Sequence, residues 1–111
     1  MVFPVEEPAL QAVCGNLIRN AQQAVSGLVG ARVRVGVSEE RDVAGRRLVV
    51  LQVADTAERT LTLDEIDARP ADRGLGQVRE RVRAWGGLLR LRPQPAPFSK
   101  SVDACFPASA T

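Results

Sequence analysis

The sequence has no histidine among its 111 residues. This absence excludes a serine–histidine or cysteine–histidine nucleophile pair and any metal site with an imidazole ligand. Proton transfer would therefore depend on carboxylates, amides or water. Aromatic residues are also scarce, because the chain has only Phe3, Trp85, Phe98 and Phe106. With so few rings for base stacking and a formal net charge of only +2, we expect no nucleic-acid partner.

Cysteines and long apolar runs are few as well. Cys14 and Cys105 both lie within apolar patterns, so we expect two reduced, buried side chains and no disulfide. No apolar run approaches the roughly 18 residues of a membrane-spanning helix. Residues 1–4 lack the basic and apolar regions of a signal peptide. We therefore expect a cytoplasmic chain without membrane contact.

The composition that is present is typical of one globular domain. Hydrophobic residues make up 45% of the chain and charged residues 25%. At this length roughly two-thirds of the unfolded surface is buried on folding. Residues 1–111 are therefore expected to form a single domain that needs no disulfide or metal to fold.

Helical spacing of apolar residues predicts two main helices. The first spans residues 6–28, with one apolar stripe that runs as far as Leu28. The second follows Gly76, ends at Gly86-Gly87, and is expected to bury its apolar face and expose a charged face that includes Arg79. A short helix is expected at residues 63–66.

Alternating or continuous apolar residues predict four strands, at residues 32–37, 48–54, 89–92 and 102–106. The valines of the first strand are expected to face inward. The near-continuous apolarity of the second indicates a central strand covered on both faces. The order helix, hairpin, loop, helix, hairpin predicts an α+β two-layer sandwich, with a mixed, mostly antiparallel sheet and the helices on one face.

Two polar features of these elements have both a structural and a functional interpretation. Asn16 and Asn20 share one face of the first helix, either as a solvated edge or as a pair of amide oxygens for a hydrated cation or a water. Asp55 follows an apolar strand, where a carboxylate either forms a turn or accepts a hydrogen bond from an amino group of a ligand.

Gly74-Leu75-Gly76, with Arg73 before it, stands where a loop leads into the second helix. Glycines at this place either give a flexible start to the helix or let backbone N–H groups approach a phosphate.

Taken in order, these segments resemble the ATP-binding domain of sensor histidine kinases, in the superfamily shared with gyrase, the Hsp90 chaperones and MutL. Residues 16–25 are similar to the N box, and residues 53–57 stand where the first glycine box is expected. Residues 74–87 resemble the second glycine box and the helix after it, and residues 102–107 resemble the closing strand. The resemblance covers roughly residues 6–107 and implies the histidine-kinase-type ATPase fold.

The resemblance implies roles for the polar residues of the N box and the first glycine box. Asn20 would hold a Mg²⁺ ion that bridges the phosphates of ATP, and Asn16 would be a catalytic residue that supports water or metal. Asp55, with Ala57 beside it, would bind the base, since the carboxylate would accept the amino group of adenine.

The second glycine box would bind the phosphates. By the resemblance, Gly74, Leu75 and Gly76 would line them at the start of the helix, and Arg73 or Arg69 would supply positive charge.

The function implied is that of a catalytic domain in a bacterial two-component system, either as a separate chain or as a fragment of a longer kinase. It would bind ATP and Mg²⁺ and transfer the γ-phosphate to a histidine. That histidine would lie on a separate helical domain for dimerisation and phosphotransfer, and a response regulator would be an indirect partner.

The sequence also departs from the family pattern. Ala57 and Arg59 replace both glycines of the first glycine box, and residues 56–73 contain no phenylalanine-bearing lid motif. Ser99-Lys100 stands where Gly-Thr is expected. Two further functions therefore stay open: a degenerate kinase-like interaction module with weak or no nucleotide binding, and a serine kinase of the anti-sigma-factor type.

Overall fold

The computed structural model describes residues 7–58, 61–72 and 74–108. The helices and strands within these ranges are α1 (Glu7–Ala24), β1 (Val33–Arg41), β2 (Arg47–Asp55), α2 (Leu63–Asp67), α3 (Gly74–Ala84), β3 (Leu88–Pro93) and β4 (Lys100–Pro107). None of these helices is both long and apolar enough to cross a membrane.

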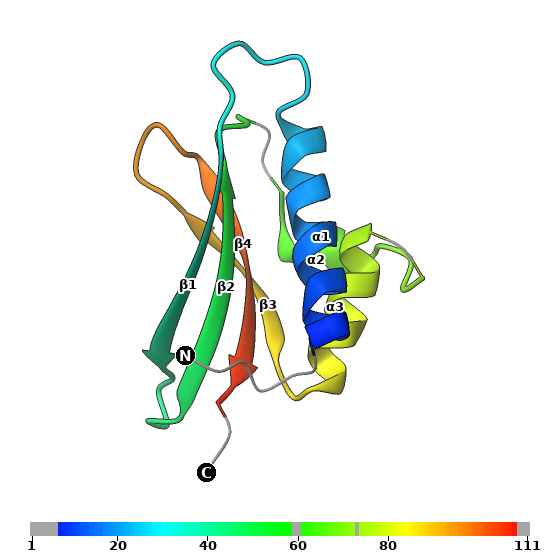
Figure 1. Ribbon diagram of the computed structural model, residues 1–111, viewed down its shortest axis with the longest axis vertical. Coiled ribbons are helices and arrows are strands. Elements are labelled where there is room, and N and C mark those ends of the chain that lie inside the picture. The colour runs from blue at the N-terminus through cyan, green and yellow to red at the C-terminus, as the bar shows by residue number, and fades with distance from the viewer. Residues whose placement is uncertain (1–6, 59–60, 73, 109–111) are drawn as a thin grey trace.

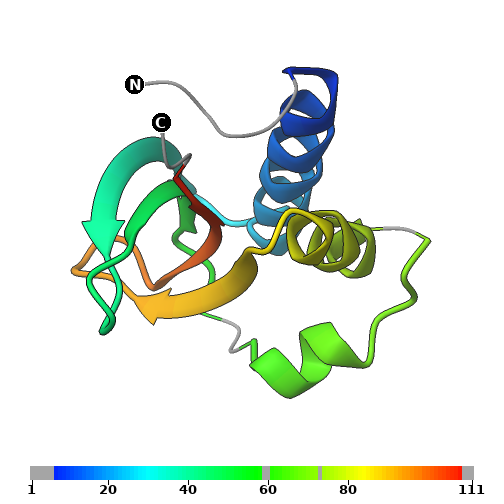
Figure 2. The same ribbon diagram turned by 90° about the horizontal axis from the view of Figure 1, so that it is seen from below.

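The four strands form one sheet in the order β1-β2-β4-β3, and every neighbouring pair is antiparallel. Helices α1 and α3 lie side by side against one face of this sheet (Figure 1). The predicted α+β class is confirmed, and the described strands make a wholly antiparallel sheet where a mixed one was expected. Figure 2 shows that the sheet is curved, with α1 and α3 on the outer side of the curve.

The main core lies between the sheet and the two long helices. Register pairs Val53 with Val102 and Leu51 with Ala104, so these side chains point to the same face. They pack with the apolar stripes of α1 and α3, including Leu17. On the opposite face of β2, Val50 and Ala54 are also buried. The prediction of a central second strand, shielded on both faces, is therefore confirmed.

Two predictions at the start of the chain are wrong in part. Helix α1 ends at Ala24, before Gly27, which has a positive φ of 81°, and Leu28 is exposed. In β1 only Val33 packs against the core, whereas Val35 and Val37 are 45% and 47% exposed. The alternation predicted the strand correctly. Val35 and Val37 are exposed because β1 is an edge strand and the described helices do not cover its middle.

Arg79 is buried and not exposed as predicted. Its side chain is 8% exposed, and its guanidinium donates to the main-chain oxygens of Ile66 at 2.7 Å and Asp67 at 2.9 Å. These carbonyls lie in the last turn of α2, where the regular hydrogen bonds of the helix end; the Ile66 oxygen also accepts from the backbone N–H of Arg69 at 3.1 Å. Arg79 therefore attaches the short α2 helix to α3.

The prediction that both cysteines are free is confirmed: neither Cys14 nor Cys105 forms a disulfide. Cys105 is buried, as expected, whereas Cys14 is only half-buried. Burial raises the pKa of the Cys105 thiol, which keeps it protonated and a poor nucleophile near neutral pH.

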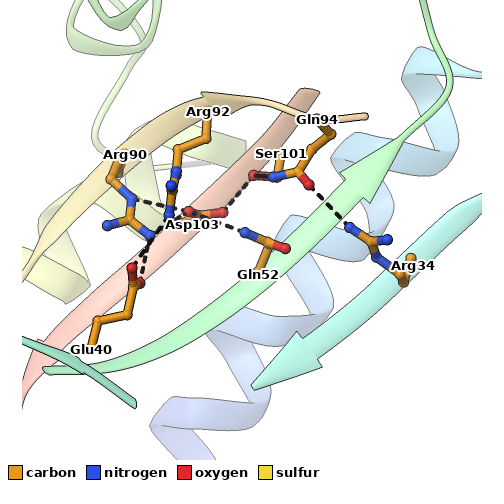
Figure 3. A network of polar contacts seen from close by, with 8 residues as sticks. All are labelled: Arg34, Glu40, Gln52, Arg90, Arg92, Gln94, Ser101 and Asp103. Carbon is orange, nitrogen blue, oxygen red and sulfur yellow. Dashed lines mark hydrogen bonds and ion pairs between the residues drawn. The ribbon is translucent and has the colours of Figure 1, made fainter. Parts of the chain in front are cut away.

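A polar network covers the face of the sheet opposite to the helices (Figure 3). At its centre the fully buried carboxylate of Asp103 accepts hydrogen bonds from Arg90 at 2.8 and 3.0 Å and from Ser101 at 2.7 Å. Arg90 also contacts Glu40 at 2.7 Å. Since Arg90 is on β3 and Glu40 is on β1, this contact joins the two outer strands of the curved sheet.

We predict that Arg90→Met lowers the free energy of unfolding by about 3–5 kcal/mol, because it leaves the Asp103 carboxylate buried without its cation. Arg92→Met is the matched control, since Arg92 also contacts Glu40 from β3 but its side chain is 49% exposed. Its cost should be less than about 1 kcal/mol. Urea unfolding of both variants measures the difference, and equal losses would contradict the role given to Asp103.

The carboxyl group of Glu40 makes the stability of the fold depend on pH in the acidic range. The hydrogen bond from Arg90 is the main cause that holds the pKa of Glu40 below its ordinary value of 4.5. A carboxyl with a lowered folded-state pKa stabilises the fold fully above the unfolded value, and this stabilisation is lost as the pH falls through the lowered pKa.

We therefore predict that Glu40→Gln loses less stability than the wild type as the pH falls below 4.5. The measurement is the free energy of unfolding of both proteins at a series of pH values between neutral and strongly acidic. Parallel profiles for the two proteins would show that Glu40 makes no such contribution.

Candidate functional site

Three adjoining cavities form a cleft beside α1. The first, of about 220 Å³, is lined by Asn16, Arg19, Asn20, Gln23, Arg69, Gly74 and Leu75. The second, of about 140 Å³, is lined by Asn20, Gln23, Ala24, Leu61, Arg69 and Lys100. The third, of about 260 Å³, shares Leu61 and Lys100 with the second and also contacts Ala57. The cleft thus brings together α1, the segment after α2, the start of α3 and the start of β4.

Asn16 and Asn20 lie on one face of α1, as the spacing predicts, and both line the first cavity. Asn16 is engaged at both ends of its amide: it donates to Gln77 at 3.1 Å, and its oxygen accepts from Arg19. The side chain of Asn20 has no hydrogen-bond partner among the described residues. As far as the described residues go, Asn20 therefore offers the cleft a free amide, and Asn16 is held by its neighbours.

Asp55 lies at the end of β2 and is only 2% exposed. Its Oδ1 atom accepts hydrogen bonds from the backbone N–H of Ala57 at 3.0 Å and from the ammonium of Lys100 at 2.9 Å. Asp55 lines none of the three cavities, whereas Lys100 lines two of them. Among the described residues at this end of β2, Lys100 and not Asp55 therefore lines the cleft.

Lys100 was not identified from the sequence as a site residue. The signal was present, because Lys100 replaces an expected threonine and begins the last strand. What was missing was the strand order. Once β4 pairs with β2, the register places Lys100 directly opposite Asp55, and side chains opposite each other in an antiparallel pair are close enough to interact.

The glycines at the start of α3 have different roles. Gly74 has a positive φ of 56° and lines the first cavity. A Cβ atom on Gly76 would lie 1.9 Å from the carbonyl oxygen of Pro70, so this glycine is required by the close approach of the preceding loop. Leu75 lines the first cavity, although its side chain is almost wholly buried. Arg73 lies outside the described residues.

The first two cavities are positively charged on their described walls, whereas Glu58 as well as Arg92 lines the third. Arg19, Arg69 and Lys100 line the first two cavities, and no described aspartate or glutamate lines them. No group of three or more His, Cys, Asp or Glu side chains that could hold a metal occurs among the described residues. The walls are therefore suited to an anion, and they supply no set of carboxylates for a metal ion on its own.

The sequence matches no protein-family model and none of the curated proteins with which it was compared.

We predict that Gly76→Ala lowers the free energy of unfolding by about 1–3 kcal/mol, since the added methyl group meets the Pro70 backbone. The matched control is Gly15→Ala in α1. There a Cβ atom meets only Arg19 Nη1 at an ordinary 3.6 Å, and alanine should stabilise the helix by about 0.5–1 kcal/mol. Chemical denaturation measures both changes. A neutral Gly76→Ala would show that the loop is not packed against α3 in this way.

Proposed function

We propose that this chain is the ATP-binding catalytic domain of a bacterial two-component sensor histidine kinase. The observation that carries the proposal is the first cavity, in which Asn20 of α1 meets Gly74 and Leu75 at the start of α3. These residues are far apart in the sequence. They belong to the two segments that resemble the N box and the second glycine box, which in the family bind one nucleotide together.

The phosphates of ATP would lie in the first two cavities. There the Asn20 amide, the Arg69 guanidinium and backbone N–H groups at the start of α3 are available as donors. Phosphoryl transfer depends mainly on positioning and on neutralising the charge of the phosphates. These groups would do both. The acceptor histidine must come from another domain or protein, because this chain has none.

The base would lie in the third cavity, whose walls include the apolar side chains of Ala57, Leu61 and Leu91. Asp55 Oδ1 is already engaged by Ala57 and Lys100, but no described residue donates to Asp55 Oδ2. Oδ2 is therefore the atom that would accept the amino group of adenine, after a small movement that exposes it.

Magnesium fits this site only as part of a nucleotide complex. The free amide oxygen of Asn20 can fill one coordination position, whereas the oxygen of Asn16 is taken by Arg19. Phosphate oxygens and water would supply the other ligands. When bound, the ion would neutralise part of the negative charge on the phosphates.

One observation favours a second candidate, the degenerate interaction module. The expected adenine-binding carboxylate is buried and paired with a lysine, so a pocket with lost base recognition would have this geometry. The exposed Val35 and Val37 on edge strand β1 are the kind of apolar surface through which such a module would bind a protein.

Calorimetric titration with Mg–ADP and Mg–ATP tests the proposal. The wild-type protein should bind, and Asn20→Ala should bind at least tenfold more weakly because it removes an amide that faces the phosphates. Gln11→Ala is the matched control, since Gln11 is exposed on the same helix and lines none of the cavities beside it. Its affinity should be unchanged.

If millimolar nucleotide gives neither heat of binding nor a shift in thermal unfolding, the kinase proposal is wrong and the interaction module is favoured.

A further inference from the structure

We infer that the second cavity, between Arg69 and Lys100, is an oxyanion subsite that holds a phosphoryl group without a metal ion. Where the phosphoryl group is part of a nucleotide, this inference rests on the proposed function and extends it. The chemistry is the same for free phosphate or pyrophosphate. The two sources are therefore separated by experiment.

Arg69 supplies the first cation. Its backbone N–H is bonded to the carbonyl of Ile66 at 3.1 Å, and the next residue, Pro70, is packed against Gly76. The backbone of Arg69 is thus held on both sides. Its half-buried guanidinium lines both the first and second cavities and has no hydrogen-bond or ion-pair partner in the part of the chain that the structure describes. A guanidinium without such a partner can donate two hydrogen bonds to a pair of phosphoryl oxygens.

Lys100 supplies the second cation. Its side chain is only 14% exposed, and Asp55 holds its ammonium at 2.9 Å. This contact uses one of the three N–H donors of the lysine, which leaves two for a ligand in the cavities that Lys100 lines. Asp55 is then a positioning residue, since it fixes the ammonium and touches no ligand in the second cavity.

Charge and size both favour a small anion. Arg69 and Lys100 carry two positive charges, Asp55 balances one, and no described acidic residue lines the second cavity. The net positive charge acts in a partly desolvated space, where its attraction for an anion is stronger than in water. A cavity of about 140 Å³ is many times the roughly 10–15 Å³ that a cavity needs to hold one water molecule. It is therefore large enough for a phosphoryl group.

The test is calorimetry in EDTA, so that no divalent metal is present, with ADP, pyrophosphate and adenosine as probes. Lys100→Met would leave Asp55 buried without its cation and risks unfolding the protein. Arg69→Gln is therefore the main variant, because no described contact depends on its guanidinium. The matched control is Arg46→Gln, whose side chain is 71% exposed and belongs to an ion pair with Asp42 outside the cleft.

We expect ADP and pyrophosphate to bind the wild type in EDTA, with at least tenfold weaker binding to Arg69→Gln and no change for Arg46→Gln. Binding of adenosine, which has no phosphate, should not respond to either variant. Thermal unfolding of each variant shows that it is folded.

The outcomes separate this inference from the proposed function. Pyrophosphate binding that Arg69→Gln weakens, with ADP no tighter, would support the subsite and contradict the nucleotide proposal. ADP binding that requires Mg²⁺, or that is unaffected by Arg69→Gln, would overturn the subsite and leave the nucleotide proposal standing. No binding of ADP or of pyrophosphate would overturn both.

Discussion

The pairing of β2 with β4 is the constraint on which the rest of the structure depends. Its register places Lys100 opposite Asp55 on the face toward the helices and Gln52 opposite Asp103 on the other face. Each buried carboxylate thereby finds donors at the end of a neighbouring side chain. A slip of β4 by one residue would turn its side chains to the opposite face of the sheet. Lys100 would then leave Asp55, Asp103 would point into the core under the helices, and the apolar residues of β4 would leave that core. The same pairing thus fixes both the core and the cleft.

The cleft is a consequence of this register. Because Asp55 is committed to Lys100, the charge presented to a ligand at this end of the sheet is that of an ammonium, which lines two of the cavities. Arg69 adds a second positive charge, and Asn20 adds a free amide. The site is therefore more basic than a pocket with a free carboxylate would be. The positive charge favours binding of the phosphates of a nucleotide more than recognition of its base. The choice between the kinase and the interaction module depends on this balance.

Periodicity predicted the elements because it reports which side of each element is apolar. It located both long helices, the short helix and all four strands, and it placed Asn16 and Asn20 together. Periodicity does not show whether another element covers the apolar face of a strand, and for this reason the burial predicted for Val35 and Val37 is wrong. Arg79 was placed outside because its partners are backbone carbonyls of another helix, which leave no trace in the residue pattern. Lys100 and the packing of Gly76 on Pro70 depend on strand order and loop path, which a single sequence does not encode locally.

The central claim is that an anionic nucleotide binds in the cleft between α1, the start of α3 and the start of β4. Two-dimensional NMR of the isotope-labelled protein, titrated with ADP, tests it residue by residue in a chain of only 111 residues. The account predicts chemical-shift changes concentrated at Asn20, Arg69, Gly74 and Lys100, with the amides of Val35 and Val37 unmoved. Saturating ADP that leaves the cleft signals in place, or moves only those of β1, would contradict it.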